Sequence, residues 1–301
     1  MATEPDLTRG RQGAQQALAE LDNLSRRQVE CDNEPLRSTL AGIARRKSGQ
    51  TWRMLEWLRQ HDPGHTPATA AGNGEVIELR TLTPELIVFK VARPPEFQFG
   101  AGHSVKVSLG ELRRPYSIVS APHEPFLEFF VELVPGGRMS EQLRRMQVGD
   151  QLDLGTPKGG LRFDDNFPHH LMVATVTGIN PFVSMLRDYL HSGRRGHHFH
   201  LMHGASYQTE FGYRDELEAL AAAHPDRLTY VATVSRPDEA ANQGWAGSAG
   251  RVDTLVDAYL ADAGLASSNT LAYACGHSGM LEAVTQQLRP GGFRLETESY
   301  D

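Results

Sequence analysis

An eight-residue stretch in the first half of the chain, 113–120, combines several groups suited to binding a cofactor. Arg114 offers a guanidinium for a phosphate, Tyr116 a ring face that could cover a planar heterocycle, and Ser117 a hydroxyl. In a strand, Ser117 points to the face opposite the other two side chains. These residues suit a phosphate-bearing aromatic cofactor, but an ordinary strand with a basic start explains them equally well.

A second candidate for phosphate binding is the glycine turn PGGRMS at 135–140, and a short helical pattern spans Ser140 to Met146. Glycine lets backbone amides approach an anion, and the first turn of a helix adds a positive dipole end. Gly137 and Ser140 are therefore predicted to hold a phosphate. The alternative is a plain strand-to-helix turn that Ser140 caps.

The second half of the chain alternates apolar runs with helical patterns, which predicts a doubly wound parallel sheet. The apolar runs span 171–178, 198–205, 228–235 and 270–276, and the helical patterns span 180–190, 210–223, 250–261 and 278–288. Ligands bind such sheets at the carboxyl ends of the strands. The loops expected to line one crevice are therefore 175–181, 204–207, 235–237 and 275–277.

The first of these loops carries groups suited to a nucleotide. The backbone amides around Thr177 and Gly178 suit a pyrophosphate, and Asn180 is expected to cap the helix that follows. A strand-to-helix turn without ligand is the alternative, because the loop lacks a full Gly-x-Gly-x-x-Gly pattern.

Two later loops add further candidates. Ser235 and Arg236 could hold the extra ribose phosphate that distinguishes NADP from NAD, and Arg251 could join them. An Arg236 that only borders the sheet in solvent is the alternative. Cys275 and Gly276 end the last predicted strand, where the thiol is expected to face the crevice unless it is an inert core cysteine.

The elements before this sheet form two parts. Apolar residues recur at helical spacing in 12–24 and 34–59, and the segment 62–74, rich in Pro, Gly and Ala, is predicted to be a linker, so residues 1–74 form a helical extension. We expect the extension to pack on the main body or dimerise the protein, with partner docking as the alternative. Short β-branched and aromatic runs over 75–165 predict an antiparallel barrel, with a sandwich as the alternative, and the parallel sheet takes 166–301.

The composition limits the class of protein. With 301 residues and 40% hydrophobic residues the chain can bury two ordinary cores, and its net charge of -7 argues against a dedicated nucleic-acid surface. The cysteines, Cys31 and Cys275, are too few for a disulfide framework or an iron–sulfur cluster, and no apolar run is long enough to span a bilayer. We therefore expect a soluble cytoplasmic protein. The histidines in 197–203 lack a carboxylate or Cys at ligand spacing, so no metal site is expected.

From about residue 75 to its end, the chain resembles the ferredoxin-NADP reductase family of flavoenzymes, most closely the bacterial type. The resemblance rests on motifs in the family's order: Arg-x-Tyr-Ser at 114–117, Gly-x-x-Ser at 137–140, the loop 175–181, the Cys-Gly pair at 275–276 and the acid-x-aromatic ending at 298–300. It implies that FAD binds the barrel and that NADP binds the parallel sheet.

The resemblance also implies roles for single residues. Tyr116 would stack on the flavin ring, Ser117 would lie near flavin N5, and the ring of Tyr300 would cover the other flavin face until nicotinamide replaces it. The catalytic residues implied are Ser117, Cys275, Glu298 and Tyr300. The expected FAD ligands are Arg114, Tyr116, Ser117, Gly137, Ser140 and Tyr300, and the expected NADP ligands are Thr177, Gly178, Ser235, Arg236, Arg251, Cys275 and Gly276.

The reaction that the resemblance implies starts with hydride transfer from NADPH to FAD, after which single electrons pass to a ferredoxin or flavodoxin. Because such carriers are acidic, we expect a basic rim on this protein, formed by Arg113, Arg138, Arg144, Arg145 and Lys158. The alternatives are the reductase component of an oxygenase system and a flavin-binding regulatory subunit without efficient hydride exchange.

Some positions depart from the family's pattern. Val176 stands where Gly is usual, so its side chain would crowd the loop that the pyrophosphate approaches. Ser206 stands where many bacterial members have Arg, so a phosphate contact would be lost. His277 replaces the Pro that usually follows the Cys-Gly pair, and Asp301 follows the terminal aromatic residue. These changes are expected to weaken NADP binding.

Overall fold

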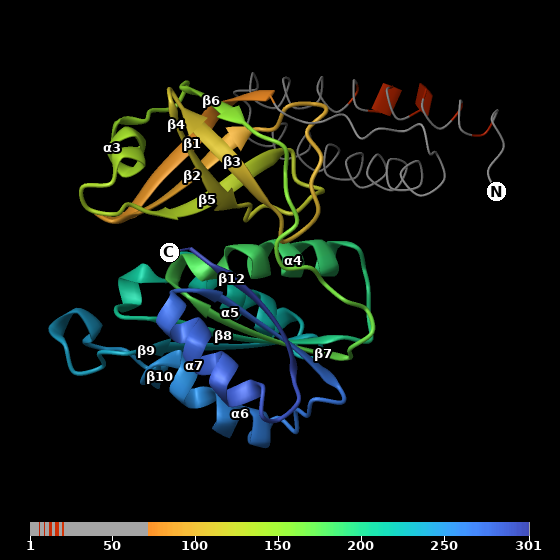
Figure 1. Ribbon diagram of the computed structural model, residues 1–301, viewed down its shortest axis with the longest axis vertical. Coiled ribbons are helices and arrows are strands. Elements are labelled where there is room, and N and C mark those ends of the chain that lie inside the picture. The colour runs from red at the N-terminus through yellow and green to blue at the C-terminus, as the bar shows by residue number, and fades with distance from the viewer. Residues whose placement is uncertain are drawn as a thin grey trace.

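The computed structural model describes residues 72–300 and, before them, Asp6, Arg9, Gln12, Gly13, Gln16, Ala17 and Glu20, which are all helical (Figure 1). The helices predicted in 34–59, and also Cys31 and Asp301, lie outside the described residues. The linker predicted at 62–74 is wrong at its end, because Gly72 to Gly74 belong to the first strand and pair with a neighbouring strand. Within the described residues, no helix is both long and apolar enough to cross a membrane.

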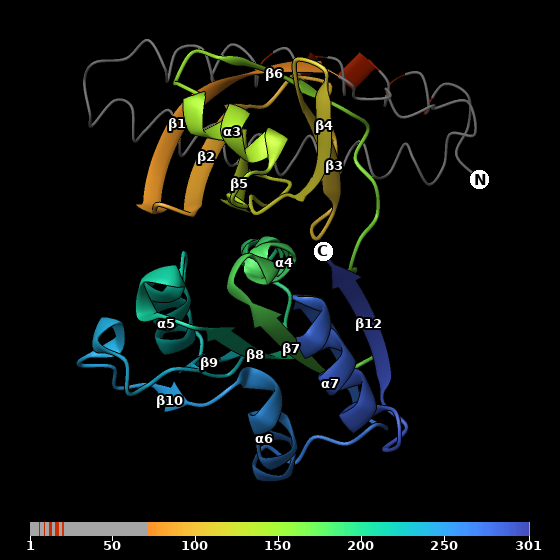
Figure 2. The same cartoon turned by 60° about the vertical axis from the view of Figure 1, so that its left-hand side comes forward.

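A six-stranded antiparallel sheet, curved into an open barrel, forms the first part of the described chain (Figure 2). Its strands are β1 (Gly72–Thr83), β2 (Leu86–Ala92), β3 (Ser104–Leu109), β4 (Leu112–Ser117), β5 (Phe126–Glu132) and β6 (Gln151–Leu154), in the order β4-β3-β6-β1-β2-β5. Helix α3 (Arg138–Arg145) buries Met139 and Leu143 in the barrel core. The stretch at 113–120 belongs to β4 only as far as Ser117, where that strand ends.

A parallel sheet forms the second part, with strands in the order β10-β9-β8-β7-β11-β12. Its elements are β7 (His169–Thr175), α4 (Asn180–His191), β8 (His198–Ala205), α5 (Arg214–Ala223), β9 (Leu228–Val234), β10 (Ser248–Ala249), α6 (Val256–Asp262), β11 (Thr270–Gly276), α7 (Ser278–Leu288) and β12 (Arg294–Ser299). Short 3₁₀ turns precede α4 (Val176–Ile179) and α6 (Val252–Leu255), and others span Gln208–Glu210 and Ala240–Asn242.

Helices cover both faces of this sheet (Figure 2). In β7, Met172 packs with α4 and α5, whereas Leu171 and Val173 pack with α6 and α7, because successive side chains of a strand point to opposite faces. The predicted barrel followed by a doubly wound parallel sheet is therefore confirmed. The sequence did not predict β10 and β12, which lie at the two edges of the sheet and are short or polar.

Helix α4 joins the two sheets through a row of polar contacts to the barrel. Asn180 Nδ2 donates to the Phe130 carbonyl at 2.8 Å, and Ser184 Oγ donates to the Ser120 carbonyl at 2.8 Å. Arg187, two turns after Asn180, donates to Glu128 at 2.6 Å. The expected capping role of Asn180 is therefore wrong: Asn180 already has helical geometry, and its side chain binds β5 instead of the start of its own helix.

Candidate active site

A cavity of about 990 Å³ lies between the barrel and the carboxyl ends of the parallel strands. It lies where the strand order reverses, between β7 and β11, which is where ligands bind doubly wound sheets. Its volume is near the upper end for ligand pockets, so it can take a large cofactor. The predicted site residues on its wall are Arg114, Tyr116, Ser117, Gly137, Ser140, Thr177, Ser235, Arg251, Gly276, Glu298 and Tyr300.

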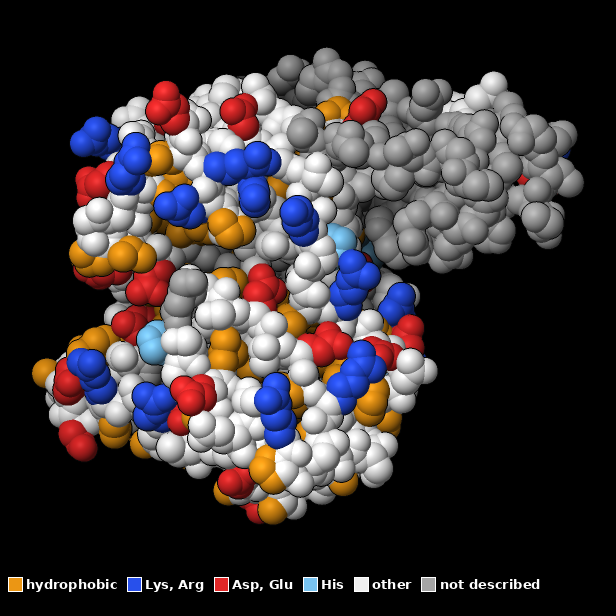
Figure 3. Space-filling view, in the orientation of Figure 1, with side chains coloured by type: hydrophobic (Ala, Val, Ile, Leu, Met, Phe, Trp, Pro, Cys, Tyr) orange, Lys and Arg blue, Asp and Glu red, His pale blue; other side chains and the backbone are white. Residues whose placement is uncertain are grey.

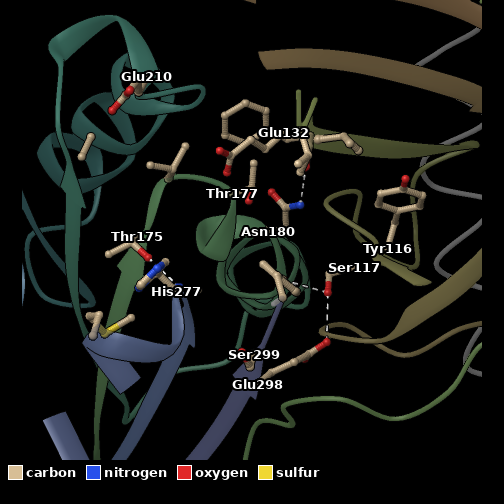
Figure 4. A pocket seen from close by; sticks show the side chains of 18 of the residues that line it. Tyr116, Ser117, Glu132, Thr175, Thr177, Asn180, Glu210, His277, Glu298 and Ser299 are labelled. Carbon is tan, nitrogen blue, oxygen red and sulfur yellow. Dashed lines mark hydrogen bonds between the residues drawn. The ribbon is translucent and has the colours of Figure 1, made fainter. Parts of the chain in front are cut away.

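The buried hydroxyl of Ser117 connects the end of β4 with β12 (Figure 4). Ser117 Oγ donates to Glu298 Oε1 at 3.2 Å and accepts from the Tyr300 hydroxyl at 2.9 Å. Tyr300 therefore points its hydroxyl inward, while the residue as a whole stays 38% exposed beside the cavity. These contacts bring together three of the predicted catalytic residues from opposite ends of the described chain.

Burial sets the protonation of the acidic groups here. It raises the pKa of Glu298, an effect that the hydrogen bond from Ser117 and the nearby Leu161 amide partly offset. Glu298 Oε2 is buried without a hydrogen bond of ordinary geometry. Burial also raises the pKa of Tyr116 to about 12, against the opposing charge of Arg114. Tyr116 is thus a neutral half-buried ring at the cavity wall.

The thiol of Cys275 does not face the crevice, contrary to the prediction. It is fully buried in β11, between β7 and β12, and does not line the cavity. Burial raises the pKa of its thiol, which interacts with the Tyr300 hydroxyl. The thiol therefore contacts a residue of the cavity wall but does not line the cavity itself.

The glycine turn before α3 opens onto the cavity, as its residues suggested. Helix α3 starts at Arg138, two residues earlier than expected, and Gly137 precedes it without a side-chain cap. The alternative in which Ser140 caps the helix is therefore wrong. A Cβ at Gly137 would lie 3.0 Å from Ser140 Oγ, so only glycine leaves this wall open beside the start of the helix.

The loop after β7 departs from ordinary geometry. Val176 has φ of 43°, and it is the only residue other than glycine with positive φ in the described part of the chain. Val176 and Thr177 line the cavity, whereas Gly178 lies behind them, where a Cβ would clash with the Cys275 carbonyl. Gly178 thus serves close packing of the loop on β11 and does not reach the cavity wall.

The predicted ribose-phosphate pocket is only partly on the cavity wall. Ser235 and Arg251 line it, but Arg236 lies off the wall, stacked over the Tyr207 ring at 5.3 Å. Arg236 Nη1 donates to the Tyr207 hydroxyl at 2.7 Å and lies 3.5 Å from Glu239 Oε1. A phosphate at Arg236 would therefore compete with a carboxylate that is already its neighbour.

The sequence did not single out several polar residues on the wall: Glu132, Glu210, Asp253 and, as a ligand, His277. Glu210 accepts from the amides of Ser206 and Tyr207, and His277 Nδ1 caps α7 by accepting from the Gly279 amide at 3.1 Å. Figure 4 shows His277 beside Thr175, whose hydroxyl accepts from the His277 amide. Position just after a buried strand is the signal that could have identified His277.

Comparison with known proteins agrees with the division of the chain into a barrel and a parallel sheet. Residues 74–163 match the oxidoreductase FAD-binding domain model, and residues 172–286 match the oxidoreductase NAD-binding domain model. A flavin-binding barrel, a nicotinamide-nucleotide-binding sheet and one cavity between them define a flavoprotein oxidoreductase.

Individual relatives narrow this class. Ferredoxin–NADP reductase B of Sorangium cellulosum is 35% identical over 224 residues, which cover 71% of this chain and 89% of the relative. The toluate 1,2-dioxygenase electron transfer component of Pseudomonas putida is 30% identical over 66% of this chain and 56% of its own length. The crystal structure of a Neisseria gonorrhoeae ferredoxin NADP+ reductase with bound FAD and NADP superposes with a TM-score of 0.67 at 25% identity, over 76% of this chain and 98% of that one. The chain belongs to the ferredoxin–NADP reductase family.

Proposed function

We propose that this protein is an FAD-dependent reductase that oxidises NADPH and delivers single electrons to a ferredoxin or flavodoxin. The observation that carries the proposal is the shared cavity, which is lined by the Tyr116–Ser117 end of β4, by the Gly276 end of β11 and by Tyr300. Bound FAD would take two electrons from NADPH and release them one at a time, chemistry that the cofactor itself supplies. We also propose that the chain divides into an N-terminal extension that ends near residue 71, a flavin-binding barrel up to residue 165 and a nucleotide-binding sheet over 166–301, because Gly72 to Gly74 already pair within the barrel.

The wall residues would bind and orient the cofactors. The ring of Tyr116 offers a flat face to the flavin, and the amides at Gly137 and Ser140, at the start of α3, would hold its phosphates. Ser235 and Arg251 would hold the ribose phosphate of NADP, with Arg236 joining them once it leaves Glu239. Ser117, Glu298 and Tyr300 form a hydrogen-bonded set that orders the floor of the site.

The acceptor would dock on the barrel beside the cavity. Arg113, Arg138, Arg144, Arg145 and Lys158 are all exposed, and the exposed apolar side chains Val134 and Val148 flank the ends of α3. Figure 3 shows Lys and Arg side chains gathered on the barrel face above the hollow between the two parts. A local basic surface on a chain of net charge -7 favours an acidic partner, such as a cytoplasmic ferredoxin or flavodoxin.

Rapid mixing of the FAD-loaded protein with NADPH or NADH tests the reaction. We expect NADPH to bleach the flavin absorbance faster than NADH does, and added ferredoxin or flavodoxin to restore it. Raising NaCl from 50 to 300 mM should slow only the second step, because screening weakens attraction between charged surfaces. A flavin that neither nucleotide reduces would contradict the reductase function.

The similarity to the toluate dioxygenase component favours one second candidate, the reductase component of an oxygenase system. The carboxylate of Glu239 beside Arg236 is compatible with it, because a carboxylate suits the free ribose hydroxyl of NADH better than a phosphate. Faster reduction by NADH than by NADPH would favour this candidate.

A further inference from the structure

The strained residue Val176 needs a physical explanation. A positive φ brings the Cβ of an L-residue close to the backbone, and a β-branched side chain makes the conformation worse. Such a conformation persists only where surrounding contacts enforce it, and strained residues concentrate at functional sites. Val176 lies on the cavity wall, directly after β7, so its contacts bear on ligand binding.

One contact that enforces the conformation comes from His203 in β8. Its Nε2 lies 3.0 Å from the Val176 carbonyl oxygen, which can only accept, so Nε2 carries the proton. Its Nδ1 lies 3.2 Å from the Tyr230 hydroxyl, and the edge of its ring meets Phe211 with centroids 4.9 Å apart. His203 is fully buried and held on several sides, so it fixes the position of the Val176 carbonyl.

The charge state of His203 agrees with this bonding. Burial lowers its pKa to about 4, although the Val176 carbonyl acts in the opposite direction. The imidazole is therefore neutral at neutral pH. It then has one N–H, which donates to the Val176 carbonyl, and one acceptor nitrogen, which accepts a hydrogen bond from the Tyr230 hydroxyl.

The bond from His203 also sets the direction of the next amide. In a trans peptide the carbonyl and the following N–H point in opposite directions, and no described peptide bond is cis. The Val176 carbonyl points back to the buried His203, so the Thr177 N–H points away from His203, and both Val176 and Thr177 line the cavity. A left-handed residue followed by helical ones makes a concave group of amides that suits an anion.

We propose that His203 is a positioning residue for the nucleotide: its hydrogen bond holds the Val176 peptide in the left-handed conformation, so that the Thr177 amide faces the pyrophosphate. The proposal rests on the proposed function, in which NADP binds this cavity. It assigns a ligand-binding consequence to a buried histidine that touches no ligand. It also explains how a valine is tolerated where the loop conformation favours glycine.

The test compares matched variants of the FAD-loaded protein by equilibrium titration with NADP⁺, by the KM for NADPH and kcat, and by flavin content. His203→Asn keeps an acceptor for Tyr230 but loses the donor to Val176, whereas His203→Gln has an amide that reaches the Val176 carbonyl. We expect His203→Asn to raise the Kd for NADP⁺ and the KM about tenfold, with kcat and flavin content unchanged. His203→Gln should restore both values to within about threefold of wild type.

A second comparison measures the effect of His203→Asn in a protein that also carries Val176→Gly. Glycine adopts φ of 43° without help, so the loss caused by His203→Asn should largely disappear in the Val176→Gly background. Equal losses in both backgrounds, or wild-type binding by His203→Asn, would overturn the proposal. If His203→Asn does not fold, His203→Met replaces it: its thioether can only accept, so the bond to the Val176 carbonyl is lost, and the same comparison with and without Val176→Gly decides.

The proposed function and the positioning role fail in different ways. Wild-type protein that neither binds NADP⁺ nor is reduced by NADPH would contradict the proposed function. Wild-type protein that does both, while the variants show no coupling between positions 176 and 203, would overturn only the role of His203.

Discussion

Ser117 shows how much one hydroxyl can organise at the residue scale. It accepts from Tyr300 and donates to Glu298, and both partners belong to the end of the chain rather than to the barrel. Their contacts with Ser117 fix the end of β12 against β4. The site is therefore completed by residues that are distant in sequence but share one buried hydrogen-bond network.

Glu298→Gln tests the buried carboxyl in this network. Burial raises the pKa of Glu298, so the folded state loses stability as pH rises through that pKa and the carboxyl ionises. A glutamine never ionises, so the variant should be more stable than wild type at pH 8, by about 1 kcal/mol. Urea unfolding at several pH values measures this, and the difference should shrink as pH falls toward 4.5. A constant difference across pH would contradict the assignment.

Gly178→Ala tests the packing of the nucleotide loop. A Cβ at Gly178 would clash with the carbonyl of Cys275, and neither backbone can move without disturbing β11. We expect a loss of about 2–3 kcal/mol in the free energy of unfolding. Gly279→Ala is the control, because a Cβ there, in the first turn of α7, meets only His277 at 3.4 Å. The control should be neutral or stabilising by up to about 1 kcal/mol, as measured by urea unfolding.

At the scale of elements, α4 determines how the two sheets are oriented. Asn180, Ser184 and Arg187 lie on one stripe of the helix and bind the barrel by hydrogen bonds, while the apolar side chains beside them join a core shared with Val88 and Phe130. This shared core explains why β2 and β5 are buried on both faces, unlike ordinary barrel strands. The cavity therefore lies between two parts that pack as one body.

Arg187→Met tests this junction. Arg187 is 15% exposed and binds Glu128 at 2.6 Å and Glu216 at 2.7 Å, with Glu124 at 3.4 Å. Removing the single cation leaves partly buried carboxylates unpaired, so we expect a loss of about 3–5 kcal/mol in the free energy of unfolding.

Arg214→Met serves as the control for Arg187→Met. The pair of Arg214 and Glu218 is a helix-surface pair at 2.6 Å, and Arg214 also stacks over Trp245. Its loss should cost about 1 kcal/mol or less. Similar losses in the two variants, measured by denaturant unfolding, would show that α4 does not depend on Arg187.

For the whole molecule, buried histidines make stability depend on pH. Burial, partial at His103, lowers the pKa of His103, His170 and His203 to about 4 and that of His200 to about 3; Arg162 adds to the effect at His103, and neighbouring histidines add to it at His170 and His200. Above pH 6.5 these groups are neutral in both the folded and the unfolded chain. Below pH 6.5 the unfolded chain takes up protons that the folded chain does not, so stability is lost as pH falls toward 4.

Thermal unfolding between pH 8 and pH 4.5 measures this effect. We expect a nearly constant Tm above pH 7 and a steep decrease below pH 6.5, of a few kcal/mol in stability by pH 5. His170→Phe should flatten the decrease, because it removes one such group, and His170 is fully buried with no partner for Nε2 among the described residues. A wild-type Tm that is independent of pH down to 5 would contradict the buried neutral state.

The sequence alone determined the architecture and most of the cavity wall. Period-two runs, buried apolar runs and glycine turns depend on local backbone preferences, so they predicted the barrel, the parallel sheet and the loops at its carboxyl edge. Tyr116, Gly137 and Thr177 lie at the strand ends and turns predicted in this way, and all three line the cavity. Edge strands escaped prediction because β12 has a polar sequence and forms only by pairing with β11.

Only the tertiary structure decided which side chains reach the cavity. Cys275 sits at the predicted strand end, yet it is buried because its side chain joins the core between the sheet and α4. Asn180 binds β5 rather than its own helix, and Arg236 stacks on Tyr207 rather than facing the cavity. These outcomes depend on contacts between segments far apart in the chain, which no local pattern encodes. Val176 and His203 are a further example. The hydrogen bond between them forms only because β7 and β8 lie side by side in the sheet.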